Sequence, residues 1–148
     1  MNILVTGGTG FVGKPLVESL LARGDSITVL TRSIEKAQAV FPEKTPKFLT
    51  ALSTLKDLNE FDAVINLAGE PIFDKRWTVQ QKEKLRNSRI NLTQQLVQLI
   101  NQSEYPPALI SGSAIGIYGN CGEDVITEYT NPSTQFTAQL CIDWENAA

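Results

Sequence analysis

The chain has 148 residues, and 42% of them are hydrophobic, which is enough for the core of one domain. Its formal net charge is −3 and its pI is near 5.0, which argue against nucleic acid or an anionic membrane as the main partner. It has no histidine, which excludes Ser-His-Asp catalysis, a histidine general base and most zinc sites. No stretch approaches the ~20 apolar residues of a membrane span.

Cys121 and Cys141 lack the spacing of a metal site, so we expect free thiols and no bound metal. A predicted strand begins at the N-terminus, so we expect no signal peptide and a cytoplasmic protein. Residues 1–89 contain all 13 Lys and Arg residues, whereas residues 90–148 contain none. This asymmetry leaves two hypotheses open: a solvated acidic surface on the second part, or a basic first part that faces an anionic cofactor.

The first predicted strand, residues 2–5, runs directly into a glycine-rich segment. Residues 6–13 read Thr-Gly-Gly-Thr-Gly-Phe-Val-Gly, and a helix is predicted over 11–23. In this setting Gly7 permits a sharp turn, Gly10 leaves room for a pyrophosphate, and Gly13 lets the helix pack close to the strand. The free N–H groups and the positive dipole end of the helix then face the phosphates.

The strand–turn–helix context favours a dinucleotide site over a merely structural turn. The cofactor-binding residues predicted in this segment are Gly7, Thr9, Gly10, Phe11, Val12 and Gly13. The apolar side of the helix is predicted to consist of Val12, Leu16, Leu20 and Leu21.

Predicted strands and helices alternate along the rest of the chain. Strands are predicted at 27–30, 47–49, 63–67 and 108–110, and helices from the N-cap Ser33 to about 41, from a capping box at Thr78 and Gln81 to about 101, and around 136–144. A loop is predicted over 112–132. This alternation predicts an α/β fold: a Rossmann-type, doubly wound parallel sheet in a three-layer αβα arrangement.

The sequence stops within the last predicted helix, at 145–148, although a two-half dinucleotide fold normally has at least one more strand. We therefore expect residues 1–148 to be a truncated NADP-binding Rossmann domain, incomplete at the C-terminus and without its substrate domain.

The residue that follows the second strand distinguishes NAD from NADP. An acid there bonds the ribose 2′-OH of NAD, whereas an arginine accommodates the 2′-phosphate of NADP. This chain has Thr31-Arg32-Ser33 nineteen residues after Gly13, with no acid before Glu35. We therefore predict NADP rather than NAD, with Arg32 as the phosphate ligand and hydroxyls from Ser33 and Thr9. The alternative is that Arg32 is a surface residue at the start of a helix.

Four segments together resemble the NAD(P)-dependent epimerase-like family, which is related to the extended short-chain dehydrogenases/reductases. They are residues 6–13, 66–72 (Asn-Leu-Ala-Gly-Glu-Pro-Ile), 76–78 (Arg-Trp-Thr) and 111–119 (Ser-Gly-Ser-Ala-Ile-Gly-Ile-Tyr-Gly). The resemblance covers the whole chain, which corresponds to the N-terminal half of such proteins. Many members are labelled nucleoside-diphosphate-sugar epimerase-like.

The resemblance also implies roles for single residues. Leu67, Ala68 and Gly69 would line the adenosine and nicotinamide-ribose side of the cofactor. Asn91 resembles an asparagine in the long helix of the superfamily, and Ser113 resembles the serine that orients a substrate hydroxyl or carbonyl. Ser113 lies one residue further from Tyr118 than is usual, and it is also placed where a serine caps a turn.

The catalytic Tyr-x-x-x-Lys motif of short-chain dehydrogenases is absent. The residues four positions after Tyr105, Tyr118 and Tyr129 are Leu109, Gly122 and Ser133, and Phe136 and Leu140 occupy the expected place of the motif. A phenol with a pKa near ~10 needs a nearby cation to exchange protons at neutral pH. Other acid/base candidates are Tyr118, Glu70, Glu123 or a group outside this chain.

The segment 70–77 follows the fourth strand, where a substrate would lie. Lys75 and Arg76 are candidates to bind a diphosphate and Trp77 to stack on a ring. The alternative, which the pattern favours slightly, is that Trp77 packs before the Thr78 cap while Lys75 and Arg76 are solvated. Three hypotheses remain: an enzyme with an unknown small-molecule substrate, a non-catalytic NADP(H) sensor, and an interaction module that forms a homodimer through the helix 78–101.

Overall fold

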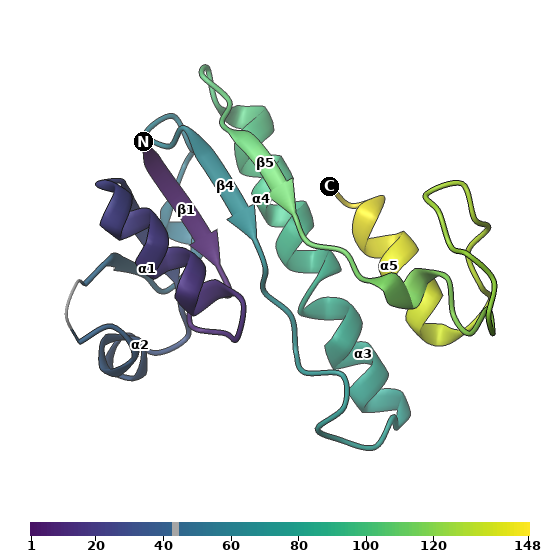
Figure 1. Ribbon diagram of the computed structural model, residues 1–148. Coiled ribbons are helices and arrows are strands. Elements are labelled where there is room, and N and C mark those ends of the chain that lie inside the picture. The colour runs from purple at the N-terminus through teal and green to yellow at the C-terminus, as the bar shows by residue number, and fades with distance from the viewer. Residues whose placement is uncertain (43–44) are drawn as a thin grey trace.

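The structure is a computed structural model that describes residues 1–42 and 45–148 (Figure 1). The described residues form one parallel sheet with the order β3-β2-β1-β4-β5. Its strands are β1 (Asn2–Thr6), β2 (Ser26–Leu30), β3 (Lys47–Leu49), β4 (Ala63–Asn66) and β5 (Ala108–Ser111). The strand order reverses at β1, which pairs with β2 on one side and β4 on the other. This confirms the predicted Rossmann-type doubly wound sheet.

Five helices and two short 3₁₀ segments accompany the described strands, and the last two of these elements follow β5. They are α1 (Gly13–Arg23), α2 (Ile34–Val40), η1 (Leu52–Thr54), α3 (Val79–Asn87), α4 (Ile90–Gln102), η2 (Ile115–Ile117) and α5 (Phe136–Glu145). None of the described helices is long and apolar enough to span a bilayer.

Alternate residues of the strands pack against helices on opposite faces of the sheet (Figure 1). On one face, Val5 of β1 belongs to a cluster with Val17 and Leu20 of α1. On the other face, Leu4 belongs to a cluster with Leu96 of α4. The two buried clusters therefore lie on either side of one sheet, as a three-layer αβα arrangement requires.

The start of α1 differs from the prediction. The helix begins at Gly13 rather than at residue 11, because residues 7–12 form the glycine-rich turn. Val12 was predicted to face the core, and this was wrong: its side chain is 61% exposed. Val17, which was not predicted, is fully buried in a cluster with Leu20, and the predicted Leu16 and Leu21 pack against the same cluster.

The helix predicted from Thr78 to about 101 is in fact two helices, α3 and α4, that meet at Ser88 and Arg89. Thr78 caps α3 as predicted, and its hydroxyl accepts from the N–H of Gln81 at 3.2 Å. The helix is interrupted because the Ser88 hydroxyl donates to the Leu85 carbonyl at 3.0 Å, and the Arg89 N–H bonds to the Arg86 carbonyl, three residues back rather than four.

Candidate functional site

A cavity of about 1070 Å³ opens at the carboxyl ends of β1, β2 and β4, where the strand order reverses. Ligands of open α/β sheets bind at this position, and the volume exceeds that of a typical small-molecule pocket. Eight of the twelve residues predicted to bind the cofactor line it: Gly7, Thr9, Gly10, Arg32, Ser33, Leu67, Ala68 and Gly69. The structure thus brings together residues from three separate segments of the chain.

The turn after β1 depends on the missing side chains of Gly7 and Gly13. Gly7 has φ +69°, and a Cβ there would lie 2.6 Å from the carbonyl carbon and oxygen of Leu67. A Cβ on Gly13 would lie 2.1 Å from the carbonyl oxygen of Gly7. These two glycines therefore let the turn approach the segment after β4, and let α1 pack onto the turn.

The first turn of α1 presents unpaired backbone donors. The Gly10 N–H bonds to the Gly7 carbonyl at 3.0 Å, and the Lys14 N–H bonds to the Gly10 carbonyl at 2.9 Å. Within the described chain, the N–H groups of Phe11, Val12 and Gly13 have no hydrogen-bond acceptor, and no side chain caps the helix. The side chains of these three residues do not line the cavity. Their predicted contribution to the cofactor site is therefore through the backbone.

Two cations line the part of the cavity next to β2. Arg32 is exposed and forms no ion pair with any described residue, and Lys36 lies in the first turn of α2. The Ser33 hydroxyl caps that helix by accepting from the Lys36 N–H at 3.3 Å. Lys36 was not among the predicted site residues. The predicted N-cap at Ser33 was the signal for it, because a cap places the residue three positions later in the first turn.

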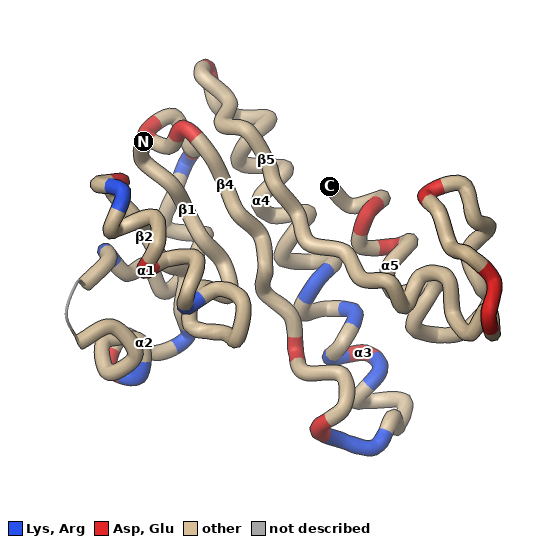
Figure 2. Tube along the Cα trace, viewed as in Figure 1, with Lys and Arg blue, Asp and Glu red and all other residues tan. Residues whose placement is uncertain are grey.

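The charge asymmetry of the sequence is visible along the fold (Figure 2). Basic residues lie just after β2, within α2 and around α3, whereas α4 and β5 contain no charged residue and the loop before α5 is acidic. Arg32 and Lys36 face the cavity, but Lys75 pairs with Glu70 and Arg86 pairs with Asp143. Only part of the basic half is therefore directed at the cavity.

Glu70 is the one carboxylate among the described residues that line the cavity. Its Oε1 accepts from Lys75 Nζ at 3.2 Å, and its side chain is 20% exposed. Lys75, with a smaller contribution from Arg32, holds the pKa of this carboxyl below its ordinary value of 4.5. At neutral pH Glu70 is therefore ionised, and it is able to accept a proton or a hydrogen bond but not to donate one.

Besides residues 11–13, three predicted site residues do not line this cavity: Ser113, Tyr118 and Asn91. Ser113 is exposed after β5, and its hydroxyl donates to the carboxylate of Glu145 on α5. Tyr118 is half-buried at the end of η2, and Asn91 is exposed on α4. The cavity is lined instead by Leu92 and Gln95 of α4, together with Ser88 at the junction of α3 and α4, at a spacing of three to four residues. That spacing is visible in the sequence and would have identified them.

The place of the missing Tyr-x-x-x-Lys motif is filled by packing. The Phe136 ring lies 5.6 Å from the Trp77 ring, and Lys82 lies 4.9 Å above it. Leu140 is 1% exposed. Trp77 Nε1 also donates to the Ile72 carbonyl at 2.8 Å. Because its ring packs against Phe136 of α5, this ring is not available to stack on a ligand. Neither Phe136 nor Leu140 lines the cavity.

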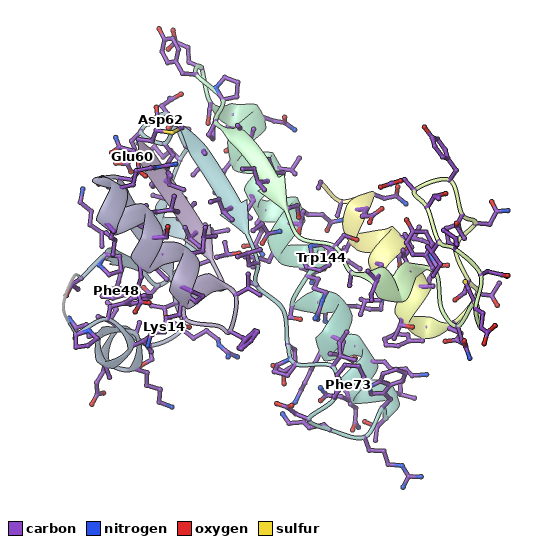
Figure 3. The ribbon with its side chains drawn as sticks, in the orientation of Figure 1. Lys14, Phe48, Glu60, Asp62, Phe73 and Trp144 are labelled. Carbon is purple, nitrogen blue, oxygen red and sulfur yellow. The ribbon has the colours of Figure 1, made fainter. Side chains whose placement is uncertain are left out.

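A buried polar network supports the same edge of the sheet and was not predicted. Asn66 Nδ2 donates to Thr93 Oγ1 at 2.8 Å, and Trp144 Nε1 donates to the same oxygen at 3.1 Å. Thr93 Oγ1 in turn donates to the Arg89 carbonyl at 2.7 Å. Trp144, labelled in Figure 3, therefore anchors α5 to the carboxyl end of β4 through α4.

The chain matches the model of the NAD dependent epimerase/dehydratase family over residues 3–148. It belongs to this family. It is 40% identical over 154 residues to the chloroplastic epimerase family protein SDR39U1 homolog of Arabidopsis thaliana, covering 100% of this chain and 44% of that protein. Membership confirms the resemblance inferred from residues 6–13, 66–72, 76–78 and 111–119.

Two solved structures of similar sequence show the same fold. Human epimerase family protein SDR39U1 (isoform 2), solved with NADPH, has a TM-score of 0.85 at 30% identity, covering 100% of this chain and 48% of that one. The nucleoside-diphosphate sugar epimerase from Corynebacterium glutamicum has a TM-score of 0.76 at 30% identity, covering 99% and 30%. The chain spans about half the length of the curated relatives it matches.

Proposed function

We propose that this chain is the NADP(H)-binding domain of an epimerase-family oxidoreductase or isomerase. The observation that carries the proposal is the pair of cations, Arg32 and Lys36, on the cavity wall next to the end of β2. A guanidinium fork at this point suits the 2′-phosphate of NADP, whereas an acid would suit the free ribose of NAD. The human family member was solved with NADPH, which supports the same choice.

The remaining cavity residues suit the other parts of the coenzyme. The free N–H groups of residues 11–13 and the dipole of α1 would hold the diphosphate. Leu67, Ala68 and Gly69 would contact the adenosine and nicotinamide-ribose side, and the Ser33 and Thr9 hydroxyls would add donors to phosphate oxygens. NADP(H) would supply the hydride transfer that these residues position.

We propose a nucleotide sugar or a related small molecule as the substrate, because the similar C. glutamicum protein is named a nucleoside-diphosphate sugar epimerase. Ser113 and Tyr118 follow β5 at the carboxyl edge of the sheet, and we propose that they act on this substrate. Glu70 lines the cavity as an ionised carboxylate, so it is the alternative proton acceptor.

A second candidate is a non-catalytic NADP(H)-binding sensor or regulator. It is favoured by Phe136 and Leu140, which cannot exchange protons and are packed among other side chains. A hydride-transfer assay of the full-length protein with a panel of nucleotide sugars distinguishes the two. Turnover supports the enzyme, whereas coenzyme binding without turnover on any substrate supports the sensor.

Titration of this chain with NADPH and with NADH, by calorimetry, tests the cofactor proposal. We expect a saturable isotherm for NADPH and binding at least about tenfold weaker for NADH. Flat isotherms for both coenzymes on folded protein would overturn the proposal.

Light scattering on the same sample tests the proposed homodimer through residues 78–101, and dimers without coenzyme affinity would indicate an interaction module. We propose a cytoplasmic location with no membrane or nucleic-acid partner.

A further inference from the structure

Arg89, between α3 and α4, is a buried cation without a carboxylate partner in the described chain. It is 9% exposed, and none of the ion pairs includes it. Burial lowers the pKa of its guanidinium, but an arginine remains charged in proteins. Because burying an uncompensated charge costs free energy, a role for Arg89 in the fold or in the site is expected.

The guanidinium holds the backbone of the segment that follows β4. Arg89 Nη1 donates to the Glu70 carbonyl at 3.1 Å and to the Leu85 carbonyl at 3.2 Å. The neighbouring Ser88 hydroxyl accepts from the Glu70 N–H at 2.9 Å. Both backbone groups of Glu70 are therefore held by two consecutive residues, and Glu70 and Ser88 both line the cavity.

Two further residues pack on the guanidinium. A Cβ added to Gly69 would lie 2.7 Å from Arg89 Cζ, so residue 69 has room for no side chain while Arg89 stays in place. The Trp144 ring of α5 lies 5.4 Å from Cζ, close enough for a cation–π contact. A side chain at Gly69, a predicted cofactor residue, would therefore have to displace the guanidinium of Arg89.

We propose that Arg89 is a positioning residue that fixes the Gly69–Glu70 wall of the cavity and connects this wall to α5 through Trp144. The proposal rests on the proposed NADP(H) function only for its binding readout. It gives α5 a role in the site that needs no proton exchange: the helix supplies the aromatic surface against which the guanidinium is held. It also explains why an arginine suits this place, since its planar fork both donates to carbonyls and packs on a ring.

The test compares Arg89→Gln and Arg89→Lys with Leu99→Val in the full chain. Leu99, on the buried side of α4, is 8% exposed and does not line the cavity, so its truncation lowers stability without touching the wall. At a temperature where all variants are folded, we expect both Arg89 variants to raise the Kd for NADPH about tenfold or more. Lysine keeps the charge but lacks the planar fork, so it should not rescue binding. Leu99→Val should leave the Kd unchanged.

Hydrogen exchange without coenzyme gives an independent readout. The Glu70 amide should exchange faster in Arg89→Gln than in the wild type or in Leu99→Val. This amide donates to the Ser88 hydroxyl, and the substitution removes the Arg89 guanidinium that donates to the same hydroxyl. Wild-type exchange at Glu70 together with wild-type affinity in Arg89→Gln would overturn the inference. If Arg89→Gln does not fold, Arg89→Lys decides by the same two measurements. If the wild-type chain binds neither coenzyme, the proposed function fails, while the exchange rates still decide the role of Arg89.

Discussion

The Thr6 hydroxyl donates a 2.7 Å hydrogen bond to Asn66 Oδ1 and so joins the carboxyl ends of β1 and β4 inside the protein. Both residues are fully buried. Thr6 Oγ1 also accepts from the Ala68 N–H at 3.2 Å, and Asn66 Nδ2 reaches Thr93 and Ser111. The segment that walls the cavity is therefore tied to the central strand by groups that satisfy one another.

Replacing Thr6 by valine tests this network. The change keeps the shape of the side chain but leaves Asn66 Oδ1 and the Ala68 N–H without their partner, and unsatisfied buried groups cost about 1–3 kcal/mol. We expect the free energy of unfolding, measured by urea denaturation, to fall by about that amount. Thr28→Val on β2 is the matched control, because the Thr28 hydroxyl makes no hydrogen bond within the described chain, and it should change stability by less than about 0.5 kcal/mol. Equal stabilities of the two variants would contradict the role of Thr6.

Arg32→Ala should weaken NADPH binding far more than NADH binding. A lost charge-assisted hydrogen bond costs about 1.5–3 kcal/mol, which corresponds to a rise of roughly tenfold to a hundredfold in the Kd for NADPH. Lys36→Ala should act in the same direction, since Lys36 lines the same part of the cavity. Lys56→Ala, an exposed lysine outside the cavity, is the control for net charge. Calorimetric titrations measure each Kd, and equal losses for both coenzymes would remove the argument for a 2′-phosphate site.

Gly13→Ala should separate α1 from the glycine-rich turn. The new Cβ would lie 2.1 Å from the Gly7 carbonyl oxygen and 2.7 Å from the Gly8 Cα, and backbone atoms cannot move aside as a flexible side chain can. We expect a loss of about 1–3 kcal/mol in the free energy of unfolding, together with loss of coenzyme binding. Gly116→Ala is the control, because its Cβ would meet only Thr137, at 3.8 Å. A Gly13→Ala protein that binds NADPH like the wild type would show that the turn tolerates the shift.

The sheet and its order of elements could be predicted from the sequence because the signals are local. Apolar runs define the strands, and β3 has the predicted residues 47–49. The division into α3 and α4 could not be predicted in this way. The Ser88 hydroxyl and the Arg89 guanidinium at the interruption bind the backbone of Glu70, which lies 18 and 19 residues away in the chain: Ser88 accepts from the Glu70 N–H, and Arg89 donates to the Glu70 carbonyl. A leucine seam continues across the interruption, so the apolar pattern does not reveal it.

The candidate site was predictable where the sheet itself determines the position of a residue. Gly7, Arg32 and Leu67 follow strands, and a parallel topology brings the ends of those strands together. Positions on helices and long loops were harder. Asn91 was placed at the site by its resemblance to a family residue, but it lies on an exposed side of α4. A different side of the same helix, with Leu92 and Gln95, lines the cavity.

The link between α5 and α3 should weaken in acid. Asp143 accepts from Gln139 Nε2 at 2.7 Å and pairs with Arg86, and these contacts hold its pKa below the ordinary value of 3.8. A carboxyl with a lowered folded-state pKa stabilises the fold above its unfolded pKa and loses that contribution as the pH falls through the folded value. We expect Asp143→Asn to be less stable than the wild type at pH 7, by under about 1 kcal/mol since the pair is partly exposed.

The difference between Asp143→Asn and the wild type should narrow as the pH falls below 3.8. Urea denaturation of both proteins at a series of pH values measures it. Glu104→Gln, on an exposed carboxylate outside the ion pairs of the described chain, is the control for the lost charge. A difference that stays constant across this range would show that Asp143 does not couple the two helices through its charge.

Restoring the missing lysine should be incompatible with the packing of α5. Leu140 is 1% exposed, so Leu140→Lys buries an ammonium without a partner and should lower the free energy of unfolding by about 3 kcal/mol or more. Leu140→Met, which conserves volume, should cost less than about 1.5 kcal/mol. Phe136→Tyr should be tolerated, because that ring is half-buried next to Trp77 and Lys82. A Leu140→Lys protein as stable as the wild type would show that the helix can turn this residue outward. If it is as unstable as expected, the absence of the motif is part of the packing of α5, and any chemistry of the parent protein must use other groups.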